Sequence, residues 1–235
     1  MSGAARRRHP ALVRVTHWLT LVAFLALLVT GVEILISHPR FYWGETGNVN
    51  TRPLFAIPIP SSRYMPTGYD YVLPDQNGWS RYLHFEAAWL TVVTGLLYVG
   101  YGLLAGHFRR TLIPSASELA PRRLANEVVR HLKFARSGHD AWAYNTLQRL
   151  SYLVVIFVLF PLIVWTGLAM SPAFESLFPS SVSMLGGRQS ARTIHFFVTI
   201  VLVLFLLVHV LMVVLAGFGP RVGAMITGRA RAPLE

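Results

Sequence analysis

The segment Ile194–Phe218, IHFFVTIVLVLFLLVHVLMVVLAGF, contains no charged residue and two histidines, and it is long enough to cross a membrane as a helix. His195 and His209 are fourteen residues apart. Fourteen residues are close to four helical turns, so both imidazoles leave the same helix face, roughly 21 Å apart along the axis. An ionisable side chain at membrane depth is costly and usually faces the interior of a bundle with a partner. The spacing therefore predicts two buried ligands on one helix face.

Composition extends this prediction to the whole chain, since the 235 residues are 54% hydrophobic and 13% charged. Such values, with the apolar residues gathered in blocks, are typical of a membrane protein. The first block follows an arginine cluster, but it is longer than a signal sequence and lacks a small-residue cleavage motif, so we expect a retained helix. Four blocks reach about 20 residues, and we expect one domain, 1–235, with helices at about 17–36, 85–105, 150–170 and 194–218.

The basic residues predict the topology. Fifteen of the 21 lysines and arginines fall in three segments: residues 1–14, His107–Arg149 and the tail from Arg221 onward. The positive-inside rule places these segments, and both termini, on the cytoplasmic side of the membrane, as expected for a multi-pass protein. The net charge of +11 is therefore topological, and we expect contacts with membrane lipid and none with nucleic acid.

The connections complete the predicted fold. The periplasmic loop 37–80 is rich in proline and aromatic residues, so we expect an ordered cap that either docks a partner or only folds on its own bundle. The cytoplasmic loop 107–149 contains Glu118–Ala135, where apolar residues recur every four positions among basic ones, as in an amphipathic helix on a membrane surface. Pro161 should kink the third helix, while neighbouring groups take up the freed carbonyl. The fold class is an all-α membrane protein, a four-helix up-and-down bundle.

Topology sorts the nine histidines. Five lie in loops or basic segments, where a solvated role is the default. The other four fall at two depths: His17 with His209 on the cytoplasmic side, and His84 with His195 on the periplasmic side. Two pairs of imidazoles from facing helices suit two six-coordinate b-type haems, each iron taking two axial ligands.

Other uses of these histidines stay open at this point. Zinc or copper would need three or four ligands at one depth, whereas these residues separate into pairs. A proton relay would string histidines with acids, but Glu33 and Glu86 are the only acids near the helices. The absence of cysteine excludes thiolate ligands, iron–sulfur clusters and covalently attached c-type haem.

Basic and small residues could complete the haem sites. Arg81, Arg192 and Arg14 each stand three residues before a candidate ligand, about one helical turn away. They could bind haem propionates, or they could be ordinary anchors at the membrane interface. Three glycines could admit a flat macrocycle or simply pack helices, namely Gly31, Gly95 and Gly167.

Four features together resemble the cytochrome b subunits that anchor bacterial formate dehydrogenase, nickel–iron hydrogenase and thiosulfate reductase, within the wider bacterial cytochrome b561-type group. They are Arg14-Val15-Thr16-His17-Trp18, Arg81-Tyr82-Leu83-His84, the His195 to His209 spacing, and Gly223-Ala224-Met225-Ile226-Thr227-Gly228. The resemblance covers all four helices. It implies a similar haem pairing, a quinone site near the inner haem and a periplasmic oxidoreductase subunit, of the molybdenum-containing kind, as partner.

The resemblance also implies a quinone residue. Tyr144-Asn145-Thr146-Leu147-Gln148-Arg149 stands where the formate dehydrogenase anchors have a Tyr-Asn-x-x-Gln-Lys segment, whose Asn helps to bind quinone. Asn145 is the candidate here, although it could equally cap a helix.

The function that we expect is electron transfer, through two haem b groups, between a periplasmic oxidoreductase subunit and quinone. Such a chain is the electron-transfer subunit of a complex rather than an enzyme by itself. Two alternatives remain: a stand-alone oxidoreductase of the same fold, for example from superoxide to quinone, and a haem-free membrane transporter or scaffold.

Overall fold

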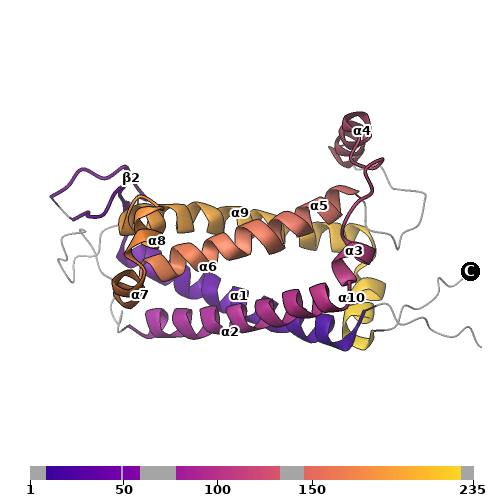
Figure 1. The fold of residues 1–235 in the computed structure, drawn as a ribbon, viewed down its shortest axis with the longest axis horizontal. Helices are drawn as coiled ribbons and strands as arrows, with labels where there is room; N and C mark the ends of the chain where they lie inside the picture. Colours follow the sequence, from indigo (N-terminus) through magenta and orange to yellow (C-terminus); the bar gives the residue numbers. More distant parts are fainter. Residues whose placement is uncertain (1–8, 49, 59–77, 133–145, 229–235) are drawn as a thin grey trace, which may run out of the picture. The chain divides into compact units, whose positions relative to one another are not determined.

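Four long apolar helices dominate the computed structural model, which describes residues 9–48, 50–58, 78–132 and 146–228 (Figure 1). Within that part of the chain, four helical segments are long and apolar enough to span a membrane. They are α1 (Ala11–Ser37), α2 (Trp79–Leu104), the run Thr146–Ala169 made of α5 (Thr146–Val154), η1 (Val155–Leu159) and α6 (Phe160–Ala169), and α9 (Arg188–Leu215). The predicted class, an all-α membrane protein, is confirmed.

Every one of these helices begins before its apolar block. The observed starts are residues 11, 79, 146 and 188, where the apolar blocks predicted 17, 85, 150 and 194. The first turn of each helix contains a basic residue, namely Arg14, Arg81, Arg149 or Arg188, so the apolar block begins only after it, although the backbone is already helical. Helix ends are accordingly the least certain part of such a prediction.

The chain forms two compact units, and each is described by itself. The first unit contains Ala11–Leu97 and Leu162–Val201, and the second contains the described parts of Tyr98–Pro161 and Leu202–Glu235. Both units draw on several of the long helices.

Small and hydroxylated side chains fill the helix contacts of the first unit. Ala23, Thr30 and Thr94 are buried on α1 and α2, and Thr166 and Ala169 are buried on α6. Thr20 of α1 lies 3.1 Å, oxygen to oxygen, from Thr94 of α2. Such residues allow close helix approach where lipid removes the usual hydrophobic drive for packing.

An aromatic cap covers the start of α9 in the first unit. The two short strands β1 (Arg40–Phe41) and β2 (Phe55–Ala56) pair antiparallel, and the Phe41 ring stacks on Phe55 and packs against Phe196 of α9, with centroids 4.7 and 4.5 Å away. The Thr193 hydroxyl donates to the Tyr42 carbonyl at 2.7 Å. The described part of the loop 37–80 is thus ordered, as expected, though its strands were not predicted.

Two short helices also precede α9, in a stretch that carried no helix prediction. They are α7 (Pro172–Leu177) and α8 (Pro179–Ser183), drawn close to the start of α9 in Figure 1. Each begins at a proline, which is favoured in the first turn of a helix. A small core of Ala169, Val182, Leu185 and Ala191 joins this stretch to α6 and α9.

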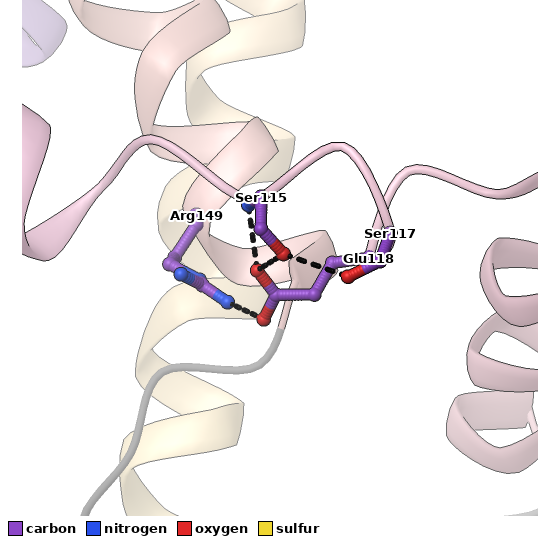
Figure 2. A network of polar contacts seen from close by, with 4 residues as sticks. All are labelled: Ser115, Ser117, Glu118 and Arg149. Atoms are coloured by element: carbon purple, nitrogen blue, oxygen red, sulfur yellow. Dashed lines mark hydrogen bonds and ion pairs between the residues drawn. The ribbon is translucent and has the colours of Figure 1, made fainter.

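The second unit contains three further helices: α3 (His107–Thr111), α4 (Pro121–Leu132) and α10 (Phe218–Thr227). The predicted amphipathic helix is confirmed as α4, which begins at Pro121 rather than Glu118, and residues 133–135 of the prediction lie outside the described residues. The loop before α4 is tied to α5, because the Glu118 carboxylate accepts hydrogen bonds from the Ser115 backbone N–H and hydroxyl, at 2.7 and 2.8 Å, and pairs with Arg149 (Figure 2).

The third span contains a π-helical segment just before Pro161, where the sequence predicted a kink. Residues Val155–Leu159 form η1, and the Phe160 backbone N–H donates to the Val155 carbonyl, five residues back. Proline supplies no N–H to an α-helical ladder, and π-bulges are one of the recurring ways in which helices absorb such an interruption.

Candidate functional site

His84 and His195 face each other inside the first unit. His84 lies in the second turn of α2 and His195 in the third turn of α9. Their ring centroids are 6.4 Å apart and the ring planes are inclined by 55°. Two residues 111 positions apart in the sequence, assigned to one depth by topology, therefore lie together in the structure.

A threonine from a neighbouring helix holds each of these two rings. The Thr30 Oγ1 of α1 lies 2.9 Å from His84 Nδ1, and the Thr166 Oγ1 of α6 lies 3.0 Å from His195 Nδ1. Both threonine side chains are fully buried. The Nδ1 atoms are thus engaged within the protein, which leaves the Nε2 atoms as the nitrogens able to bind a metal.

The glycine that follows each threonine borders the same ring. A Cβ atom on Gly31 would lie 3.6 Å from His84 Cε1, and one on Gly167 would lie 3.4 Å from His195 Cε1. Of the three glycines that the sequence suggested, these two touch a candidate ligand. A Cβ atom on Gly95 would meet nothing within 4 Å, apart from its own helix backbone.

The spacing of the two rings fits a bis-imidazole metal site. With metal–nitrogen bonds of about 2 Å and about 1 Å from each nitrogen to its ring centre, two axial imidazoles place their centres about 6 Å apart. The observed 6.4 Å agrees with that value. Within the described residues, no group of three or more histidine, cysteine or acidic side chains gathers in a form that could hold a metal ion.

Basic groups gather near this pair. Arg192, one turn before His195 on α9, donates to the His38 carbonyl, and its guanidinium carbon lies 5.0 Å from the centre of the Phe41 ring. Burial and the positive charges of Arg192 and Arg81 lower the pKa of His38. His38, which the sequence treated as a solvated loop residue, is therefore partly buried and lies within the field of both arginines.

The other predicted pair is divided between the two units. His17 is exposed on α1 of the first unit, its ring edge-on to Trp18 at 5.3 Å, and Arg14 is partly buried one turn earlier. His209 lies in the part of α9 that belongs to the second unit. The pairing of His17 with His209 stays a prediction, and Asn145 lies outside the described residues.

His209 has its own aromatic surroundings. Its ring stacks on Phe205, with centroids 5.9 Å apart, and its Nδ1 lies 3.4 Å from the Tyr152 hydroxyl of α5. The sequence analysis did not single out Tyr152, Thr30 or Thr166. A Thr-Gly dipeptide occurs in each of the first three apolar blocks, and only the fold shows that those of the first and third contact a histidine, whereas Thr94 of the second contacts Thr20.

Comparison with known proteins gives the family of this chain. Residues 8–228 match the family described as prokaryotic cytochrome b561. The chain is similar to the putative protein-methionine-sulfoxide reductase subunit YedZ1 of Azospira oryzae, with 32% identity over 212 residues, covering 88% of this chain and 90% of that protein. No solved structure matches the chain. The chain therefore belongs to the prokaryotic cytochrome b561 family and is an integral inner-membrane cytochrome subunit that binds haem b.

Proposed function

We propose that this chain carries two haem b groups and transfers electrons between a periplasmic oxidoreductase subunit and the quinone pool. The observation that carries the proposal is the pair of imidazoles of His84 and His195, 6.4 Å apart with both Nδ1 atoms engaged. Four apolar helices supply the membrane path. A bound haem supplies an iron that gains and loses one electron, and the protein positions it.

The periplasmic haem site is built from the first unit in this proposal. His84 and His195 provide the axial nitrogens through Nε2, and Gly31 and Gly167 keep the ring edges free of side chains. Arg81 and Arg192 would bind the propionates, and the support for this is their place one helical turn before His84 and His195. A charge-assisted hydrogen bond to a carboxylate is about twice as strong as a neutral one.

The cytoplasmic haem site uses His17 and His209, with Arg14 as the propionate partner. Its support is the fourteen-residue spacing on α9, which carries a second ligand roughly 21 Å along the same helix face. The helix is continuous from Arg188 to Leu215, so that spacing is preserved in the fold. The aromatic contacts of Phe205 and Tyr152 hold the His209 ring in place.

Quinone binds near the cytoplasmic haem in this proposal, with Asn145 as its polar contact. Support comes from the family resemblance of residues 144–149 and from the position of Asn145, which directly precedes α5, the helix that carries Tyr152 to His209. An amide can donate to a quinone carbonyl and accept from a quinol hydroxyl.

The proposed partner is a periplasmic oxidoreductase subunit, molybdenum-containing by family resemblance. The name of the similar Azospira oryzae protein describes a subunit of a reductase, which favours a complex over a chain that works alone. The rival is a self-sufficient oxidoreductase of the same fold. Co-purification of a soluble subunit in mild detergent supports the complex, and steady turnover by the isolated chain supports the rival.

The haem content of the purified chain tests the proposal. We expect reducible b-type Soret and α bands, and two haem b groups per chain by pyridine haemochrome. Absence of a reducible b-type spectrum would overturn the cytochrome function, and a content of one haem per chain would overturn the two-site arrangement.

The quinone site has a separate test in Asn145→Ala. Both haems should remain, while quinol oxidation or quinone reduction slows. Asn145→Ser is the control, because serine is as good a helix cap as asparagine but lacks the amide. Slow quinone kinetics in both variants support the quinone role, whereas wild-type kinetics in Asn145→Ala, or full recovery in Asn145→Ser, return Asn145 to capping.

A further inference from the structure

The hydrogens of the two threonine hydroxyls are already committed inside their own helices. The Thr30 Oγ1 donates to the Ala26 carbonyl at 2.7 Å, and the Thr166 Oγ1 donates to the Leu162 carbonyl at 2.8 Å. The next carbonyls back, those of Leu27 and Ile163, also lie within 3.2 and 3.1 Å of the two hydroxyls. Carbonyl oxygens only accept, and a hydroxyl has a single hydrogen to donate.

The imidazoles must therefore be the donors in the contacts of Thr30 with His84 and of Thr166 with His195. A hydroxyl whose one hydrogen is already donated to a carbonyl can only accept a further hydrogen bond. Nδ1 therefore carries the proton in both rings. Each neutral imidazole then keeps its lone pair on Nε2, the form that ligates a metal. Both threonine side chains are fully buried, so solvent water does not compete for the hydrogens of their hydroxyls.

The arrangement occurs twice in the first unit with the same parts. In each case a Thr-Gly dipeptide of one helix meets the histidine of another, with the hydroxyl at Nδ1 and the glycine at Cε1. In an apolar helix, a threonine hydroxyl can satisfy its hydrogen-bonding capacity by donating to a carbonyl of its own helix, without a partner from another helix. Thr91 of α2 is such a residue, bonded to the Ala87 carbonyl at 2.9 Å and buried.

We propose that Thr30 and Thr166 are positioning residues that fix the tautomer and orientation of His84 and His195 and tune the haem bound between them. This inference rests on the proposed function, because it assigns the two histidines as axial ligands. When the N–H of a ligating imidazole that does not bind the metal donates to a partner, the nitrogen that binds the metal becomes more basic. The more basic ligand favours the ferric over the ferrous form, so each threonine lowers the midpoint potential of that haem.

The variants Thr30→Val and Thr166→Val test this role, since valine keeps the shape and removes the acceptor. We expect a positive shift of one midpoint potential in each variant, the same haem being affected in both, with haem retention 10- to 100-fold weaker, in the range typical for loss of such partners. For a one-electron couple, a tenfold change in the ferric-to-ferrous preference corresponds to about 59 mV. The second haem serves as an internal standard.

The controls separate this role from simple packing. Thr91→Val removes a buried hydroxyl of the same type that contacts its own helix, and it should leave both potentials unchanged. Thr30→Ser and Thr166→Ser keep the hydroxyl and should restore the wild-type potential and the low-spin electron paramagnetic resonance signal. Unshifted potentials with intact haem in both valine variants, or a shift equal to that of Thr91→Val, would overturn the inference.

Two further outcomes are informative. If a valine variant does not fold, the serine variant decides: a wild-type potential supports the hydroxyl role, and a shifted one contradicts it. If the wild-type chain binds no haem, the proposed function fails, a result distinct from failure of the inference, which requires haem to be present.

Discussion

The rings of His84 and His195 are each held by a side chain from another helix, and this is what distinguishes a site from two isolated histidines. Burying a polar nitrogen without a partner costs roughly 1–3 kcal/mol. Here one nitrogen of each ring is satisfied by threonine, and the other is available to a metal. When a metal binds both Nε2 atoms, every ring nitrogen of the pair has a partner.

Single histidine substitutions test the pairing of the ligands. His84→Ala and His195→Ala should each abolish the same haem, because loss of either axial ligand disrupts one site, while His17→Ala and His209→Ala should abolish the other. Redox titration followed at the α band distinguishes the two haems by potential. Loss of different haems from the two members of a pair would contradict the assignment.

Part of the site could be predicted at this scale and part could not. The four histidines were identifiable because an ionisable residue in an apolar block is rare and costly. Thr30 and Thr166 were not, because threonine in such a block ordinarily bonds its own helix. His38 looked like a loop residue, and only the fold brings it near Arg81 and Arg192.

At the scale of elements, the end of α2 depends on a glycine. A Cβ atom at Gly102 would lie 2.3 Å from the ring of Phe108, which is buried and packed against Tyr98 and Phe157. Because these rings leave Phe108 little room, Gly102→Ala should destabilise the chain by about 1–3 kcal/mol, as overpacking usually does. Thermal unfolding in detergent measures the effect.

Gly100 provides the matched control in the same helix. A Cβ atom there would meet nothing within 4 Å, apart from its own helix backbone, so Gly100→Ala should be neutral, or stabilising by up to about 1 kcal/mol through helix propensity. Equal unfolding temperatures for the two alanine variants would show that Phe108 does not constrain the end of α2.

The contact between Glu118 and Arg149 predicts a pH dependence. Hydrogen bonds from the Ser115 backbone and hydroxyl, followed by Arg149, lower the pKa of Glu118 below its usual 4.5. A depressed carboxyl pKa stabilises the fold above the unfolded-state value, and that contribution is lost as pH falls through the folded-state value. Protection of the Ser115 amide from hydrogen exchange, corrected for intrinsic rate, should therefore persist at neutral pH and fall below about pH 4.5.

Two variants check that this loss comes from the carboxylate. Glu118→Gln should lower protection of the Ser115 amide already at neutral pH and remove its acid dependence. Ser117→Ala should change neither, because in that network the Ser117 hydroxyl contacts the Ser115 hydroxyl, at 3.1 Å, rather than the carboxylate (Figure 2). Wild-type protection in Glu118→Gln would assign it to the loop backbone alone.

Elements were predicted unequally from the sequence. The four spans and α4 follow from long apolar blocks and from a four-residue repeat. The short helices α7, α8 and α10 and the strands β1 and β2 do not, because segments of two to ten residues carry too few positions to establish a period. The π-helix before Pro161 could be anticipated only as an interruption.

For the whole molecule, the charge distribution predicts that both termini face the cytoplasm. A green fluorescent protein fused after Glu235 should fluoresce, and alkaline phosphatase fused there should be inactive, since each reporter works on one side of the membrane only. A fusion within residues 44–48, in the predicted periplasmic loop, should give the opposite pair of results. An active phosphatase at the C-terminus would reverse the topology and the proposed sides of both haems.

The sequence by itself determined that this chain spans a membrane four times and carries histidines at two depths, because apolar length and the cost of buried charge are local properties that composition and spacing record. Only the tertiary structure decided which side chains meet. It supplied Thr30 and Thr166 as the partners of His84 and His195, a pair that the topology had already predicted, and it brought His38 near two arginines. These contacts link residues 29 to 154 positions apart, and they depend on which face of a helix is presented to its neighbour. No pattern along one helix specifies such contacts, since they follow from the packing of several helices at once.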